Sequence, residues 1–467
     1  MERIAYTPPD DALDETVAAT PRVRERYEAI LGELASRGAA GVRERVQADM
    51  GREGVCFRHS DGRKPFRVDP IPRLLAAEEW EALEAGLAQR AEALERFIRD
   101  AYSDQRIVAS GALPERVIST AAHFDHRLRG LEVPGNAYVY VYGPDIVRDP
   151  HGELLVLEDN MRTPSGVAYL LAIHEAVGRE LGSELGEVRE PDPALGLLAS
   201  ALRLAAPGTD DPEVALLTDG KGSPAYYEHC ELARRLDVAL VTLDDVAAQG
   251  DELVRHDDRG VKRRIDVIYR RTDEASFTAD DGGITPLAQN LRGPIEAGRL
   301  GVANAFGSGI GDDKLTHAYI DTMIRFYLDE EPLLRSVRTL DLGDSEQLAE
   351  ALGRLDELVV KERHRAGGVG VMVEPEEEPE GVEGVRRTIE ERGDGLVAQE
   401  RVEISSHPTI VNGGFEPRRV DLRPFIFRAA DGWKGIPGGL TRFAATSDSL
   451  VVNSTQGGGG KDTWVLT

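Results

Sequence analysis

The chain has 467 residues, the length of about three domains, so a single small domain is excluded. Its composition, 41% hydrophobic and 30% charged, is that of a globular protein with a large core, which excludes wholesale disorder. The net charge of −27 and the pI of about 4.9 make the average surface repel phosphate backbones and anionic lipid heads. Nucleic-acid and membrane partners are therefore not expected.

Lysine and cysteine are both scarce. Seven lysines accompany 49 arginines, so each lysine is a candidate for a specific role. The cysteines, Cys56 and Cys230, form no close pair, and residues 1–9 contain no apolar run like that of a signal peptide. No run of 18 apolar residues occurs, so no membrane-spanning helix is expected. These features predict a reduced, cytoplasmic protein.

Residues 22–105 show mostly helical periodicity. Apolar side chains recur there at steps of three, four and seven: Trp80, Leu83, Leu87, Ala91, Leu94 and Ile98. An insert at 51–73 is typical of a hairpin around Asp61-Gly62. Residues 138–160 then predict strand, turn and strand, with Asp149-Pro-His-Gly152 suited to a type I turn.

The second half of the chain changes character twice. After an expected linker near 191–212, the strands and helices of residues 213–305 predict a doubly wound α/β unit. From residue 358 onward strands dominate, which favours a mostly β lid. The acidic run at 374–380 is typical of a solvated loop, because clustered like charges repel each other.

The hairpin at 138–160 carries acidic side chains. If Asp149 faces Gly152 across the turn, Asp145 faces Val156 and becomes a diagonal neighbour of Glu158. Asn160 adds a neutral oxygen on the same face. Such hard oxygen donors suit Mg²⁺, which takes one or two carboxylates together with substrate phosphates and water. The alternative is a charged, solvated face of an edge hairpin.

A second candidate is Lys361, which ends an apolar strand, followed by Gly367, Gly368 and Gly370. Lysine can meet a phosphate there, while glycines let backbone N–H groups approach the anion. The alternative is a flexible hairpin tip with a surface lysine. No Walker A loop occurs, and the glycines of residues 306–311 lack the spacing of a nicotinamide-binding loop.

The C-terminal third adds further candidates for anion binding. Arg423 and Arg442 suit a bidentate grip on phosphate or carboxylate. Asn453 and Lys461 flank a run of four glycines. Upstream, the strand Gln399–Val402 could offer backbone groups to an adenine edge.

Together these segments resemble the ATP-grasp superfamily, specifically its circularly permuted branch related to the synthetase part of glutathionylspermidine synthetase. The segment Asp312–Leu315, the Lys361 loop and residues 399–402 keep the order of ordinary ATP-grasp ligases. The metal block, residues 145–166, instead precedes the Rossmann-like unit, and 25 residues follow Arg442. The similarity extends from about Pro65 to the C-terminus.

The resemblance implies an α/β fold with α+β lobes: a circularly permuted ATP-grasp core, a Rossmann-like pre-ATP-grasp unit and a helical N-terminal region. The implied divisions are a mostly helical region at 1–135, a metal-ligand hairpin and helix at 136–195, the Rossmann-like domain at 205–330, and the lid with the remaining core at 331–467.

The resemblance also implies roles for individual residues, which fall into three groups. Mg²⁺ is expected on Asp145, Glu158 and Asn160. ATP is expected on Lys314, Lys361, Arg162, Gly367, Gly368, Gly370, Gln399, Glu400, Arg401 and Val402. The reaction itself is expected to involve Arg423, Arg442, Asn453 and Lys461. Apart from the resemblance, Ser165, Arg270 and Arg271 are candidates for holding the substrate carboxylate, because arginine pairs and small-residue loops can grip one, and structural ion pairs explain them equally well.

The expected function is an ATP-dependent carboxylate–amine ligase that works through an acyl phosphate and releases ADP and phosphate. Two alternatives stay open: a nucleotide-binding scaffold without turnover, and an ATP-dependent small-molecule kinase. The expected partners are a small-molecule or peptide carboxylate and an amine acceptor. The sequence indicates neither their identity nor the oligomeric state.

Overall fold

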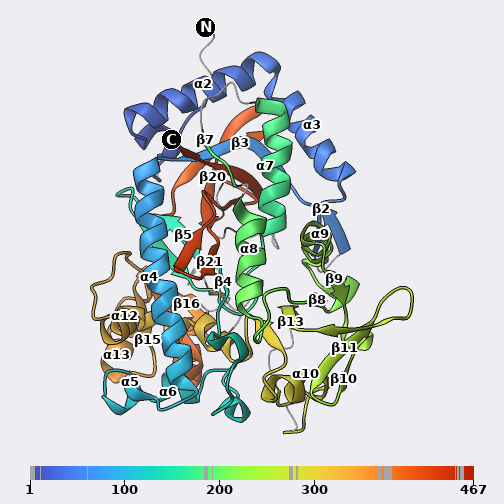
Figure 1. Cartoon of the computed structure of the whole chain (residues 1–467). Coiled ribbons are helices and arrows are strands. Elements are labelled where there is room, and N and C mark those ends of the chain that lie inside the picture. The colour runs from blue at the N-terminus through green and yellow to red at the C-terminus, as the bar shows by residue number, and fades with distance from the viewer. Residues whose placement is uncertain are drawn as a thin grey trace.

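The computed structural model describes residues 6–10, 12–59, 62–182, 188–191, 193–272, 277–279, 282–364, 371–372, 381–447, 449, 452 and 457–467. Long helices surround a central sheet, and the two chain ends lie at the same end of the molecule (Figure 1). This arrangement places residues from both ends of the sequence in one core.

The N-terminal region is helical, as its periodicity predicts. Its helices are α1 (Glu15–Ala18), α2 (Pro21–Arg37), α3 (Ala39–Arg52), α4 (Ala77–Ala101), α5 (Arg106–Ala109) and α6 (Arg116–Ser119). All six apolar positions expected on α4 are at most 1% exposed. They pack α4 against α12 (Ile320–Leu328) and β22 (Gly432–Gly435). The expected hairpin is present as β1 (Cys56–His59) and β2 (Gly62–Pro65), with His59 opposite Gly62.

The central sheet joins strands from the two ends of the sequence. Its order is β3 (Val68–Leu75), β24 (Gly459–Leu466), β23 (Leu440–Phe443), β20 (Gly414–Arg423), β5 (Asp145–Arg148) and β6 (Leu154–Glu158). β19 (Ser406–Val411) pairs with β20, and β7 (Val188–Arg189) pairs with β24. β3 and β24 are buried along their whole length, and they run parallel. The hairpin of β5 and β6 therefore shares a sheet with strands of the last fifty residues.

The doubly wound unit is confirmed. Its parallel sheet has the order β14 (Gly301–Ala303), β13 (Val267–Arg271), β8 (Val214–Thr218) and β9 (Ala239–Val241). Chain order reverses between β8 and β13, which makes their carboxyl ends the switch point of this sheet. The remaining elements here are α9 (Tyr226–Leu236), α10 (Pro286–Glu296) and an antiparallel sheet of β10 (Val246–Gln249), β11 (Glu252–His256) and β12 (Lys262–Ile265).

The prediction of a linker at 191–212 is wrong for most of that segment, because helix α8 (Pro193–Leu204) occupies it. Ala194, Leu198, Ala201 and Leu202 are buried on one face of this helix. Their spacing of three and four is the helical period, and the two flanking prolines obscured it. The helix packs against β13 and β21 (Ile426–Ala429), so the segment joins the α/β unit to the central core.

The unit expected to be mostly β contains helices as well. Its antiparallel sheet has the order β15 (Thr339–Asp341), β18 (Leu396–Glu400), β16 (Leu358–Glu362) and β17 (Val371–Met372). Helices α13 (Ser345–Gly353) and α14 (Gly381–Arg392) contribute to its separate apolar core. The acidic run at 374–380 lies outside the described residues.

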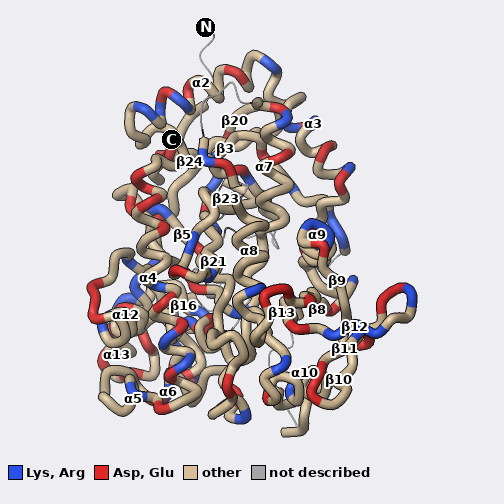
Figure 2. Tube along the Cα trace, viewed as in Figure 1, with Lys and Arg blue, Asp and Glu red and all other residues tan. Residues whose placement is uncertain are grey.

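The other elements complete the walls around the core. A small sheet contains β22, β21 and β4 (Val141–Tyr142), and two further helices are α7 (Val167–Leu181) and α11 (Lys314–Ala318). Acidic and basic residues are both spread over the molecule (Figure 2). Across the described residues, no helix is both long enough and apolar enough to span a membrane.

Candidate active site

The hairpin of β5 and β6 has a register that differs from the expected one. Asp145 was expected opposite Val156, but Ile146 is opposite Val156 and Asp145 is opposite Glu158. The turn is the reason. Gly152 donates to the Asp149 carbonyl at 3.0 Å, as in a type I turn, and then adopts φ of +89°. Asp149 consequently pairs with Glu153, the pattern of a type I turn followed by a glycine bulge.

A second irregularity lies between Asp145 and Ile146, and it brings Asp145 directly opposite Glu158. The two carboxylates nevertheless bind different cations. Asp145 accepts from Arg423 Nε at 2.7 Å and Nη2 at 2.8 Å, and Arg442 lies 3.0 Å away. Burial alone would raise the pKa of Asp145, but these two arginines lower it to about 2. Asp145 is thus ionised and engaged by the strands beside it.

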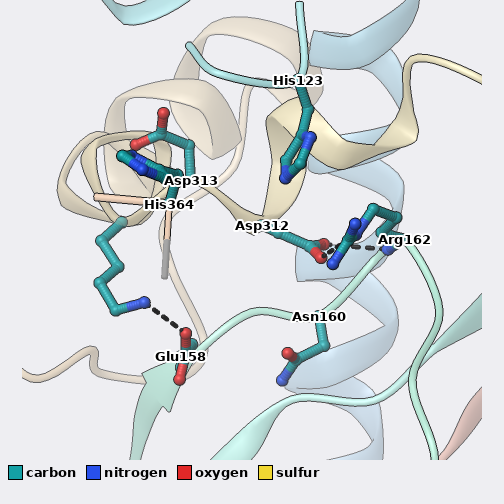
Figure 3. A pocket seen from close by; sticks show the side chains of 8 residues that line it. His123, Glu158, Asn160, Arg162, Asp312, Asp313 and His364 are labelled. Atoms are coloured by element: carbon teal, nitrogen blue, oxygen red, sulfur yellow. Dashed lines mark hydrogen bonds and ion pairs between the residues drawn. The ribbon is translucent and has the colours of Figure 1, made fainter. Parts of the chain in front are cut away.

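A pocket opens on the other side of Glu158 (Figure 3). Its lining side chains come from four separate stretches of the chain: His123, Glu158, Asn160, Arg162, Asp312, Asp313, Lys314 and His364. Glu158 accepts from Lys314 Nζ at 2.7 Å. Asn160 Nδ2 donates to the Gly143 carbonyl at 3.0 Å, which leaves the amide oxygen to a ligand. The pocket therefore combines carboxylates, an amide oxygen and cationic groups.

Asp312 fixes the backbone that carries Arg162. Its carboxylate accepts from the backbone N–H groups of Met161 and Arg162, the second at 2.9 Å. Burial raises the pKa of Asp312 to about 6, against the opposing effect of Arg162. Arg162 Nε lies 3.9 Å from the Asp312 carboxylate. This wall of the pocket is held by the segment that immediately precedes Lys314.

Asp313 fixes the helix that carries Lys314. Its carboxylate caps α11 through the backbone N–H of Leu315 at 2.9 Å. The same carboxylate accepts from Arg363 at 3.0 and 2.9 Å, and both side chains are buried. Arg363 lies two residues after Lys361. The Lys314 helix and the Lys361 strand are thus tied together by one buried ion pair.

Lys361 lies close to this pocket but is held by a different partner. Its ammonium donates to Gln399 Oε1, and Gln399 donates in turn to the carbonyl of Leu157 at 3.1 Å. Burial lowers the pKa of Lys361 to about 8, with Glu158 raising it and Lys314 lowering it. Gln399 therefore connects the expected phosphate-binding lysine to the strand that ends in Glu158.

The rest of the expected adenine segment leaves the interior. Glu400 accepts from Arg354 at 2.8 Å on the surface, and the Arg401 side chain is exposed. Val402 packs beside a small cluster that includes Val147 and Ile404. Within this segment, Gln399 is the residue that faces the core.

The expected catalytic arginines belong to one ion-pair network with Asp145. Arg442 donates to Asp421 Oδ1 at 2.9 Å as well as approaching Asp145. Arg423 also donates to the Ser165 carbonyl at 3.3 Å. The network thus connects β5, β20 and β23 with the loop that follows the acidic hairpin.

Two of the expected substrate residues, Ser165 and Arg271, meet at that same loop. Arg271 donates to the Pro164 carbonyl at 2.8 Å and to the Ser165 hydroxyl, and it lies 3.5 Å from Glu228. Arg270 donates to the Asn304 carbonyl at 3.2 Å and lies over the ring of Phe306. Both arginines are buried. Arg271 holds the backbone between β6 and α7, whereas Arg270 holds the backbone of Asn304, and neither side chain lines the pocket.

Lys461, expected at the floor of the reaction site, is fully buried. Its ammonium donates to Asp69 and to the Pro408 carbonyl at 3.0 Å. Gly367, Gly368, Gly370 and Asn453 were expected to contact ATP or the reacting groups, and all four lie outside the described residues.

Sequence reasoning missed His123 and His364, and it quoted Asp312 and Asp313 only as part of a motif. The adjacency of these acids to Lys314 was the available signal for them. His123 had none, because its loop shows no motif and reaches the pocket only through packing. Behind Glu158 lies another unforeseen group, a buried cluster of Asp159, Arg90, His317 and Tyr142.

The oxygen donors in the pocket fit a magnesium ion. Glu158 and Asn160 face it together with Asp312, and Mg²⁺ prefers one or two carboxylates completed by phosphate and water. Among the described residues, no group of three or more His, Cys, Asp or Glu side chains could hold a metal ion. Both carboxylate oxygens of Asp145 accept hydrogen bonds from Arg423, and Asp145 contributes its negative charge to the ion-pair network beside the pocket.

Comparison with known proteins finds a family model that matches most of the chain. The model of circularly permuted ATP-grasp type 2 proteins matches residues 72–444. An uncharacterized protein of Mycobacterium tuberculosis is 39% identical over 97% of this chain and 84% of its own length. A Frankia casuarinae protein provisionally named a glutamate–cysteine ligase is 41% identical over 97% of this chain, and the match covers 53% of that protein.

One solved structure shares the fold over its full length. A glutathione synthetase-like effector from Globodera pallida, solved in its apo form, has a TM-score of 0.61 at 10% sequence identity. The match covers 97% of this chain and 100% of the effector. At this sequence identity the likeness shows the fold alone and gives no information about the substrate.

Proposed function

This chain belongs to the circularly permuted ATP-grasp type 2 family, and from that premise we propose that it is an ATP-dependent carboxylate–amine ligase. The expected fold class is confirmed: an α/β protein with a permuted ATP-grasp core, a Rossmann-like unit and a helical N-terminal region. The observation that carries the proposal is the pocket in which Glu158, Asn160, Arg162 and Lys314 face one another.

The pocket offers groups of both signs for a nucleotide and its metal ion. Lys314, Lys361 and Arg162 are the cations that would contact the phosphates, and Gln399 is placed to orient Lys361. Glu158 and Asn160 would hold Mg²⁺, which when bound neutralises charge on the phosphates. A phosphate at Lys314 would compete with Glu158 for the ammonium, and so release the carboxylate toward the metal ion.

The proposed reaction has two steps. A substrate carboxylate oxygen attacks the γ-phosphorus of ATP, ADP leaves, and an acyl phosphate forms. An amine then attacks the acyl carbon, the bond to the phosphate oxygen breaks, and inorganic phosphate leaves. No protein nucleophile is required, because positioning and neutralisation of developing negative charge supply the catalysis. Arg423 and Arg442, which pair with Asp145 opposite Glu158, would help to neutralise the charge that develops on the transferred phosphoryl group.

The substrates are proposed by class only, as a small-molecule or peptide carboxylate and an amine. Glutamate and cysteine are the first pair to test, because of the Frankia relative's name. About half of that relative lies outside the match, so its name does not fix the substrates of this chain.

The first experiment is calorimetric titration of the protein with a nonhydrolysable ATP analogue, with and without Mg²⁺. We expect binding that Mg²⁺ strengthens and that Lys361→Ala weakens by about tenfold or more. Lys434→Ala is the matched control, because that lysine pairs with Asp431 on an exposed turn. Absence of nucleotide binding to the unmodified protein would refute the proposal.

The second experiment separates a ligase from the two alternatives. Carboxylate and amine pairs are screened for ADP release, with hydroxylamine added in parallel to trap an acyl phosphate as a hydroxamate. A ligase releases ADP and forms hydroxamate. A kinase releases ADP and yields a stable phosphorylated product, whereas a scaffold binds the nucleotide without releasing ADP.

A further inference from the structure

His123 lines the pocket from a loop that belongs to none of the expected binding segments. Its ring projects toward Arg162 and Asp312 from the side opposite Asn160 (Figure 3). Within the described part of the chain, most other lining side chains hold the walls: Glu158 with Lys314, Asp313 with Arg363, and Asp312 with backbone N–H groups. The imidazole of His123 makes no hydrogen bond to the described residues, so it is available to a bound molecule.

The loop around His123 is rigidly anchored on both sides. The Tyr102 hydroxyl donates to the His123 carbonyl at 3.4 Å and stands 3.4 Å from the backbone N–H of Asp125. Phe124 stacks on the Tyr102 ring with centroids 5.1 Å apart. Asp125 in turn accepts from the backbone N–H of Phe277 at 2.9 Å. These contacts fix the position of His123 without using its ring.

The glycine segment at 306–311 supplies the space that the ring occupies. A Cβ on Gly309 would stand 2.8 Å from His123 Cβ and 3.0 Å from its Cγ, closer than such atoms approach. Gly307 and Gly311 give similar close approach to Tyr102 and Met161. This segment, which lacks the spacing of a nicotinamide-binding loop, therefore packs closely against the His123 loop and the Met161 side chain.

The surroundings of His123 keep its ring unprotonated. Burial lowers the pKa of His123 to about 4, Arg162 and Arg270 lower it further, and Asp313 opposes them. His364, which lines the same pocket, also lowers the pKa of His123. At neutral pH the imidazole of the free protein is thus unprotonated, and anionic phosphates bound beside Arg162 would raise its pKa toward the range of an effective proton acceptor.

We infer that His123 is a catalytic residue of the second step, the group that accepts the proton from the attacking amine. The inference rests on the proposed ligase function. The amine lone pair forms the C–N bond, its N–H proton moves to the unprotonated nitrogen of His123, and the C–O bond to the phosphate breaks. Inorganic phosphate leaves with that electron pair, and His123 returns the proton to solvent. The acceptor is therefore an amine that enters between His123 and the acyl phosphate.

Two variants test this role with a control from the same loop. His123→Gln removes the proton acceptor, and Gly309→Ala displaces the ring by steric contact. His126→Gln changes the exposed histidine three residues along, whose ring packs on Phe124 outside the pocket. Binding of a nonhydrolysable ATP analogue is measured for all three, and affinities within about twofold of the unmodified protein show an intact nucleotide site.

The decisive readout compares two acceptors with one carboxylate. With the screened amine, His123→Gln should form amide at least about 10²-fold more slowly, the usual contribution of a positioned acid–base group. With hydroxylamine, whose nitrogen gives its proton to water more readily, hydroxamate should form within about threefold of the unmodified rate. Gly309→Ala should show the same division, and His126→Gln should form both products normally.

Two results would overturn the inference. Normal amide formation by His123→Gln excludes His123 as the proton acceptor. Equal loss of amide and hydroxamate places its role in the phosphoryl-transfer step instead. If the unmodified protein binds nucleotide but forms neither product with any pair, the ligase proposal fails first and the inference fails with it.

Discussion

Asp145 and Glu158 stand opposite each other across β5 and β6, yet each carboxylate binds a cation from a different part of the fold. Asp145 is held by Arg423 and Arg442 of the central sheet, whereas Glu158 pairs with Lys314 at the start of α11. Asp145 is 8% exposed at its side chain and Glu158 is 24% exposed. Glu158, the more exposed of the two, therefore lines the pocket, whereas Asp145 belongs to the charge network beside it.

Glu158→Gln should reduce ADP release by about 10² to 10³-fold, by analogy with removal of one charge-stabilising group from an active site. The amide keeps the shape of the side chain but removes its charge, so Mg²⁺ should enhance nucleotide binding less. Steady-state ADP release and titration with a nonhydrolysable analogue measure the two effects. Glu153→Gln, an exposed position on the same hairpin, is the control. Full activity of Glu158→Gln would remove Glu158 from the proposed metal site.

Nucleotide affinity should fall as pH rises through the pKa of Lys361. Burial lowers the pKa of Lys361 to about 8, so the ammonium that attracts phosphate is lost between about pH 7 and 9. The dissociation constant of the analogue should then rise toward tenfold per pH unit above the pKa. Lys361→Arg remains charged throughout this range and should bind with little pH dependence. Parallel pH profiles for the two proteins would contradict the assignment.

The helices and strands of this fold were predicted correctly from the sequence where the local periodicity was strong. The apolar face of α4 and the parallel strands of residues 213–305 were both identified, because each burial pattern repeats at the period of its own element. α8 was missed because Pro191 and Pro212 made the stretch between them resemble a linker. Register was the weakest inference, since the bulge at Gly152 shifted the pairing of Asp145.

The candidate site was predicted only in part, for a reason of geometry. Glu158, Asn160, Arg162 and Lys314 were identified because their segments resemble family motifs, and the structure brings them to one pocket. Lys461 was placed in the reaction site on the same grounds, but its ammonium is buried against Asp69. Long-range packing decides which side of a strand faces a pocket, and a single sequence does not contain that information.

The ion pairs of Asp145 should contribute stability that is lost in acid. Because Arg423 and Arg442 lower the pKa of Asp145 to about 2 from an ordinary value near 4, the contribution is present above pH 4. It disappears as pH falls from about 4 toward 2, and it amounts to about 2 kcal/mol at neutral pH. Urea unfolding of the unmodified protein and Asp145→Asn should therefore give free energies that converge on acidification. A constant difference between pH 6 and 3 would contradict this prediction.

Asp159 should be far more important for stability than a surface acid of similar chemistry. It accepts from Arg90 twice at 2.7 Å, from the Tyr142 hydroxyl at 2.5 Å and from His317 at 2.8 Å, and it is 2% exposed. Asp159→Asn leaves the guanidinium of Arg90 buried without its counter-charge, and the expected loss is about 3 to 5 kcal/mol in the free energy of unfolding.

The matched control for Asp159 lies on the same helix as Arg90. Glu81 pairs with Arg189 on the surface, where its side chain is 58% exposed. Glu81→Gln should therefore change the free energy of unfolding by no more than about 0.5 kcal/mol, because water screens exposed ion pairs. Urea unfolding at neutral pH compares both variants with the unmodified protein. If both variants lose equal stability, the buried cluster is not what holds the end of β6 against α4 and α11.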